Sequence, residues 1–78
     1  MALSPQSPDV PEEIVFAVGE SDEGGFEARA LGFDIFTEAD TTAALHEMIR
    51  DAVRCHFEPG RAPRVIRLHH VHDEVIQA

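Results

Sequence analysis

Hydrophobic and polar positions repeat with a helical period in one stretch of the chain, TEADTTAALHEMIRDAVRCHF, residues 37–57. Projection at about 100° per residue predicts an amphipathic helix with one apolar face. The centre of this face consists of Leu45, Met48, Ile49, Ala52 and Val53, and its edges of Ala44, Cys55 and Phe57. The polar arc is only about 100° wide. We therefore expect a sheet on one side of the helix and a second cover, such as another copy of the chain, on the other.

Residues at both ends of this stretch carry helix boundary signals. Asp40 or Thr41 can act as the N-cap, because a short side-chain oxygen there accepts a hydrogen bond from a first-turn N–H. Pro59 disfavours the α conformation of the residue before it. The helix is therefore expected to end near Phe57.

The residues before the helix predict two strands joined by a hairpin. The run EIVFAV, residues 13–18, is apolar on both faces, so we expect neither face of this strand to be in contact with water. The loop GESDEGG, residues 19–25, can close a hairpin because Gly24 and Gly25 tolerate positive φ. In the next run, residues 26–32, apolar and polar side chains alternate, which is typical of a half-buried strand.

Two more strands complete the expected domain. The segment FDIF, residues 33–36, predicts a short third strand, and RVIRLHHV, residues 64–71, predicts the fourth. The order β-β-β-α-β indicates a two-layer α+β domain with one helix packed on a small, mostly antiparallel sheet. This leaves the second sheet face without a layer, so we expect a homodimer or higher oligomer with Val15, Val75 and Ile76 in the contact.

Composition sets the broad class of the protein. Residues 1–11 contain three prolines and no periodicity and are expected to form a disordered tail, while residues 12–78 form a single domain. No run of about 18 apolar residues predicts a membrane span. With no signal-peptide pattern and one cysteine, a cytoplasmic location is expected.

Charge is distributed unevenly along the chain, which has a net charge of −9. The first 40 residues hold ten acids and one base, Arg29, whereas the remainder holds five acids and five arginines. Phosphate repulsion opposes nucleic-acid binding by such a chain. The acidity favours solubility or a basic partner.

The motifs IVFAVGESDEGGF, EARALGFDIF and TEADTTAALHEMIRDAV occur in this order, and RVIRLHHVHDEVIQA follows them. In this arrangement, residues 13–78 resemble the HicB-like antitoxin domain, particularly its short stand-alone form. The resemblance implies an oligomeric, truncated ribonuclease-H-like fold that lacks that fold's catalytic carboxylates. Full antitoxins of this kind neutralise a small basic RNA-cleaving toxin and usually carry a DNA-binding segment after the domain. No helix-turn-helix or ribbon-helix-helix pattern occurs here, so operator binding is not expected.

If the chain is an antitoxin, the acidic first half is expected to contact the toxin. Its charged contributors are then Glu20, Asp22, Glu23 and Glu27. Alternatively, the chain is a homo-oligomeric module whose partner is itself. We expect no catalytic residues and no cofactor: Asp34 is isolated in its short strand, and Cys55 lacks the cavity that nucleophilic catalysis requires.

A rival hypothesis places a metal or small ligand on three histidines. His70 and His72 share one side of the last strand at period two, and His56 projects toward the apolar helix face. Together they offer imidazole ligands of the kind that zinc prefers. No pair of Cys or His residues has structural-zinc spacing, so metal binding is the less favoured hypothesis.

Overall fold

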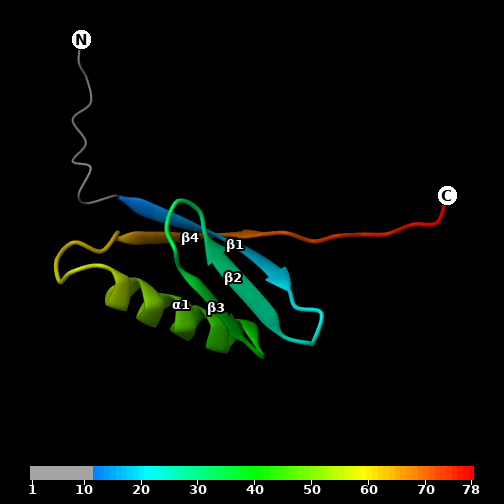
Figure 1. Cartoon of the computed structure of the whole chain (residues 1–78), viewed down its shortest axis with the longest axis horizontal. Coiled ribbons are helices and arrows are strands. Elements are labelled where there is room, and N and C mark those ends of the chain that lie inside the picture. Colours follow the sequence, from blue (N-terminus) through cyan, green and yellow to red (C-terminus); the bar gives the residue numbers. More distant parts are fainter. Residues whose placement is uncertain (1–11) are drawn as a thin grey trace, which may run out of the picture.

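In the computed structural model, residues 12–78 form a four-stranded sheet with one helix packed on one face (Figure 1). The elements are β1 (Glu13–Glu20), β2 (Phe26–Ala30), β3 (Phe36–Ala39), α1 (Thr42–His56) and β4 (Val65–His70). The strand order is β3-β2-β1-β4, in which β1 pairs in parallel with β4 and the other pairs are antiparallel. The expected α+β class is confirmed. The expected disordered tail lies outside the described residues.

The core lies between the sheet and α1. Every second residue of β1 points into it, because side chains alternate between the two faces of a strand. The buried apolar set is Ile14, Phe16, Val18, Ala28, Ala30, Ile35, Leu45, Ile49 and Val53. Full burial of each large member stabilises the fold by about 1.5–3 kcal/mol before entropy is subtracted.

The buried face of α1 is narrower than the periodicity predicts. Its buried residues are Leu45, Ile49 and Val53, which recur every fourth position. Met48, expected at the centre of the apolar face, has 47% of its surface exposed. Because a sheet lies on one side only, one row of side chains is buried. The sheet of the same chain therefore does not cover Met48, and the expected second cover stays a prediction.

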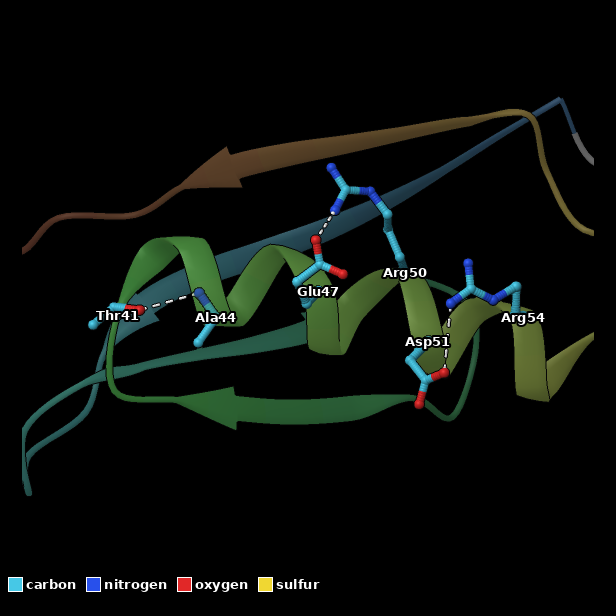
Figure 2. A network of polar contacts seen from close by, with 6 residues as sticks. All are labelled: Thr41, Ala44, Glu47, Arg50, Asp51 and Arg54. Atoms are coloured by element: carbon cyan, nitrogen blue, oxygen red, sulfur yellow. Dashed lines mark hydrogen bonds and ion pairs between the residues drawn. The ribbon is translucent and has the colours of Figure 1, made fainter.

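The ends of α1 agree with the expected boundaries. The Thr41 side chain accepts a hydrogen bond from the Ala44 N–H at 3.1 Å, so Thr41 is the N-cap (Figure 2). The C-cap is Phe57, whose N–H donates to the Val53 carbonyl. Two exposed ion pairs lie along the helix, Glu47–Arg50 at 2.8 Å and Asp51–Arg54 at 3.6 Å. Exposed pairs of this kind contribute little to stability.

The third strand begins later than predicted. Residues 33–36 were expected to form it, but β3 covers Phe36–Ala39. Phe33 instead packs its ring against the rings of His56 and Phe57, with centroid distances of 6.0 and 5.2 Å. The chain must turn back after β2 before it can pair again, and the Ala30 N–H to Ile35 carbonyl bond closes this turn.

The β1–β2 hairpin closes through its two glycines, as the sequence predicts. Gly24 and Gly25 adopt φ values of 97° and 83°. The Ser21 N–H donates to the Gly25 carbonyl at 3.0 Å, and the Gly24 N–H donates to the Ser21 carbonyl at 3.1 Å. β1 extends two residues beyond the expected end at Val18 before the loop begins.

The sheet face opposite α1 carries no second layer within residues 12–78. At its centre Val15 and Ala17 are half-buried. Farther out, Leu31, Phe36 and Val65 are exposed. The described part of the chain contains no helix long and apolar enough to cross a membrane.

Candidate functional site

Carboxylates gather at the end of the sheet where the β1–β2 hairpin turns. The register pairs Phe26 with Ala39, which brings the end of β3 beside the start of β2 and therefore beside the hairpin loop (Figure 1). The side chains that meet here come from β1, the loop and the β3–α1 junction. We refer to them as the acidic end: Glu20, Asp22, Glu23, Glu38 and Asp40.

Two open hollows mark this end of the molecule. The larger has a volume of about 430 Å³ and is lined by Ser21, Glu23, Gly24, Phe26, Glu38, Ala39 and Asp40. The smaller, about 260 Å³, lies where the chain leaves β4 and is lined by Gly19, Glu20, Ser21, Asp22, Val71, His72 and Asp73. Carboxylates from separate segments thus line each hollow.

Two glutamates oppose each other next to the acidic end. Glu27 of β2 and Glu38 of β3 are direct partners in the strand register. Like charges in this position repel each other and weaken the pairing. Among residues 12–78, no arginine forms an ion pair with either carboxylate. A cationic group supplied from outside would relieve this repulsion.

Of the four acids expected to contact a partner, the structure groups three. Glu20, Asp22 and Glu23 lie at the acidic end, whereas Glu27 points to the open sheet face beside Glu38. Sequence reasoning missed Glu38 and Asp40 as members, because both precede the helix and Asp40 was considered only as a candidate N-cap. The strand register is the signal that places them here.

The three candidate metal-binding histidines do not meet. His56 ends α1, where its ring packs against Phe57 at a centroid distance of 5.0 Å. His70 ends β4 and His72 follows it, at the other end of the sheet from His56 (Figure 1). In the described residues, no group of three His, Cys, Asp or Glu side chains is placed to hold a metal ion.

The two residues considered for catalysis lie on the surface. Asp34 is exposed in the turn before β3, and the thiol of Cys55 is exposed on α1. Neither side chain lines either of the two hollows at the acidic end.

A groove with a basic rim separates α1 from β4. Its volume is about 450 Å³, and it is open to solvent. Ile49, Ile66 and Leu68 form its apolar part, and His46, Arg50 and Arg64 form its polar part. Arg50 is held by Glu47 on the exposed side of the helix (Figure 2). This groove combines apolar surface with positive charge.

An ion pair joins β1 and β4 on the open sheet face. The Arg67 guanidinium donates to both carboxylate oxygens of Glu13, with Nε–Oε2 and Nη2–Oε1 distances of 2.9 Å each. These hydrogen bonds lower the pKa of Glu13 and raise that of Arg67. The pair links two strands that are distant in sequence.

The residues expected to support self-association lie in two places. Val15 is half-buried on the open sheet face. Val75 and Ile76 follow β4 and are 91% and 81% exposed. The structure does not bring Val15 together with the other two.

Comparison with known proteins identifies two relatives. A UPF0150 protein of Archaeoglobus fulgidus is 50% identical over 52 residues, which is 67% of this chain and 77% of the relative. A UPF0150 protein of Thermotoga maritima is 43% identical over 68 residues, which is 87% of this chain and 96% of the relative. No family model matches the chain, and no solved structure matches it.

Proposed function

The chain belongs to the UPF0150 family, and we propose that it is a non-enzymatic protein-binding domain whose acidic end binds a small basic protein. The resemblance of residues 13–78 to the HicB-like antitoxin domain supports one kind of partner. That partner is a small basic RNA-cleaving toxin, which the domain neutralises by covering its active surface.

The observation that carries this proposal is the pairing of Glu27 with Glu38 in the strand register, where no arginine of residues 12–78 forms an ion pair with either carboxylate. A fold keeps a repulsive pair at little net cost when a bound cation compensates it. Lysine or arginine side chains of a basic partner would supply this charge. They would also enter the open hollow formed by the loop and the β3–α1 junction.

The proposed setting is the cytoplasm. Cys55 is the chain's single cysteine and exposes a free thiol. Such thiols persist in reducing compartments. An RNA-cleaving toxin would also act there.

A growth assay with two matched variants tests the proposal. The chain is co-expressed with a small basic RNA-cleaving toxin of the kind that HicB-like antitoxins neutralise, and rescue of growth is measured. Replacement of Asp22 by Asn and Glu23 by Gln is expected to abolish rescue and weaken binding about tenfold or more, because two partner-facing charges are lost.

The control variant removes the same charge elsewhere. Asp34→Asn and Glu58→Gln are exposed and lie outside the acidic end, so rescue and affinity should remain near those of the unmodified chain. Equal loss in both variants would indicate that only net charge matters. No binding by the unmodified chain would refute the proposal.

A further inference from the structure

We propose that two copies of the chain associate by exchanging their C-terminal segments, so that residues 71–78 of each copy pair antiparallel with β4 of the other. We call residues 71–78 the arm. The two sheets would then join into one, with a twofold axis beside Val71. This interface uses none of the five carboxylates of the acidic end, although Val71, His72 and Asp73 also line the smaller hollow there. It is argued from the β4 edge and the arm alone and does not depend on the proposed function.

Within residues 12–78, no strand pairs with the outer edge of β4. β4 is the last strand in the order β3-β2-β1-β4. On its inner side, the Val65 and Val71 N–H groups donate to the carbonyls of Glu12 and Val18 at 3.3 and 2.7 Å. Because backbone direction alternates along a strand, the even-numbered residues 66–70 direct their N–H and C=O groups outward. An edge of this kind readily accepts another strand.

The arm has the conformation and composition of such a strand. It continues the direction of β4 and runs away from the body of the molecule (Figure 1). The hydrogen bond from Val71 to Val18 fixes its direction at the start. Val75 and Ile76 are almost fully exposed in a single copy. A second copy would remove this apolar surface from water.

β4 and the arm of the second copy have matching lengths. An axis at Val71 places His70 opposite His72 of the second copy, and Ile66 opposite Ile76. All six residues of β4, Val65–His70, are then paired with residues 72–77. Opposed residues share a face of the sheet, as antiparallel pairing about a twofold axis requires. The outward backbone groups of β4 each gain a partner.

On the helix side, this register fills the groove between α1 and β4. Glu74 and Ile76 of the second copy fall on the face that carries Ile66 and Leu68. Ile76 meets Ile66, which belongs to the groove's apolar part, and Glu74 enters near its rim. The rim carries His46, Arg50 and Arg64. The basic rim therefore suits Glu74, and the apolar part of the groove suits Ile76.

On the opposite face, the register also gives favourable pairs. Val71 meets its own copy at the axis, which is a hydrophobic contact. His69 meets Asp73 of the second copy, a donor facing a carboxylate. Val75 lies diagonal to Val65, which is exposed in a single copy. Both faces of the arm therefore find complementary neighbours.

Disulfide trapping tests the interface and its register. In a Cys55→Ser background, Val71→Cys places two thiols at the axis in a non-hydrogen-bonded pair, where the backbones approach to about 4.5 Å between Cα atoms. This separation lies within the range of disulfide bonds. We expect a covalent dimer on mild oxidation, seen on a non-reducing gel. The matched His72→Cys and Asp73→Cys variants should stay uncoupled, because neither residue faces itself.

Light scattering of the full chain gives a second test. The unmodified chain should be a dimer, and Ile76→Asp should lose it because a carboxylate would enter the apolar part of the groove. Gln77→Asp adds the same charge next to this position and should retain the dimer. A monomeric unmodified chain, or trapping at position 72 or 73 as efficient as at 71, would overturn the proposal whatever the acidic end binds.

Discussion

At Gly25, the backbone of the β1–β2 hairpin lies very close to the backbone of the segment between β3 and α1. Its φ of 83° lies in the region that side chains with a Cβ rarely adopt. A Cβ there would lie 2.6 Å from the Ala39 carbonyl oxygen and 3.2 Å from the Asp40 Cα. The acidic end can form only because the two backbones approach this closely.

Substitution of Gly25 by Ala should therefore be costly. We expect the free energy of unfolding to fall by roughly 2–4 kcal/mol, from backbone strain plus the clash with Ala39. Gly24→Ala is the control: its φ is 97° and its surroundings are open, so it bears only the strain, about 1 kcal/mol. Urea denaturation compares the two. Equal losses of unfolding free energy in the two variants would contradict the close approach of Gly25 to Ala39.

The Glu13–Arg67 pair predicts a pH dependence at the same scale. Folding lowers the pKa of Glu13 from its usual 4.5, so its contribution to stability is present above that pH and is lost as pH falls through the folded pKa. A double-mutant cycle with Glu13→Gln and Arg67→Gln should show favourable coupling at about pH 7, and this coupling should decline once the pH falls below 4.5 and through the folded pKa of Glu13. Coupling that persists in acid would contradict the ionic origin.

In α1, packing buries fewer side chains than the hydrophobic periodicity predicts. Periodicity identifies the apolar side of the helix but not how much of it the sheet covers. Ile49 is buried, whereas Met48, its neighbour on the same predicted face, is half-exposed. In this fold the sheet fully buries Leu45, Ile49 and Val53 and covers Ala52 in part.

Two alanine substitutions test this difference. Ile49→Ala should lower the free energy of unfolding by about 2–5 kcal/mol, because it removes buried atoms and leaves a cavity. Met48→Ala should change it by about 0.5 kcal/mol or less. Thermal and urea denaturation measure both. A cost for Met48→Ala close to that for Ile49→Ala would show that a second layer covers the helix in solution.

The elements also show what the sequence could and could not predict. Local signals were sufficient for α1 and its ends, for the glycines of the hairpin, and for the alternation in β2. The third strand was misplaced because Phe33 has strand propensity yet packs beside His56 and Phe57. The conformation of Phe33 depends on contacts with residues more than 20 positions away in the sequence, and a local pattern cannot reveal such contacts.

The candidate site was predictable to a similar extent. The loop acids Glu20, Asp22 and Glu23 stood out as a charged turn. Glu38 and Asp40 join them only through the pairing of β2 with β3, and the opposition of Glu27 to Glu38 is likewise a matter of register. The sequence shows that these acidic residues exist, but not that they lie close together in the fold.

In the whole molecule, the clustered carboxylates and the exposed apolar side chains of the arm lie on different surfaces. The net charge of −9 arises in the first half of the sequence, and its loop and β3 carboxylates collect at one end of the sheet. The β4 edge, the basic-rimmed groove and the exposed Val75 and Ile76 make up a different surface. The proposed contact with a basic protein and the proposed contact between two copies would therefore use different surfaces, which adjoin at the hollow lined by Asp22 and Asp73.

An NMR titration of the ¹⁵N-labelled chain with a small basic RNA-cleaving toxin, of the kind that HicB-like antitoxins neutralise, tests whether the acidic end is the binding surface. We expect amide shifts to change at residues 20–27 and 38–40 and added salt to weaken the binding, because the proposed contact is ionic. Shift changes confined to the groove or the arm, or none at all, would contradict it.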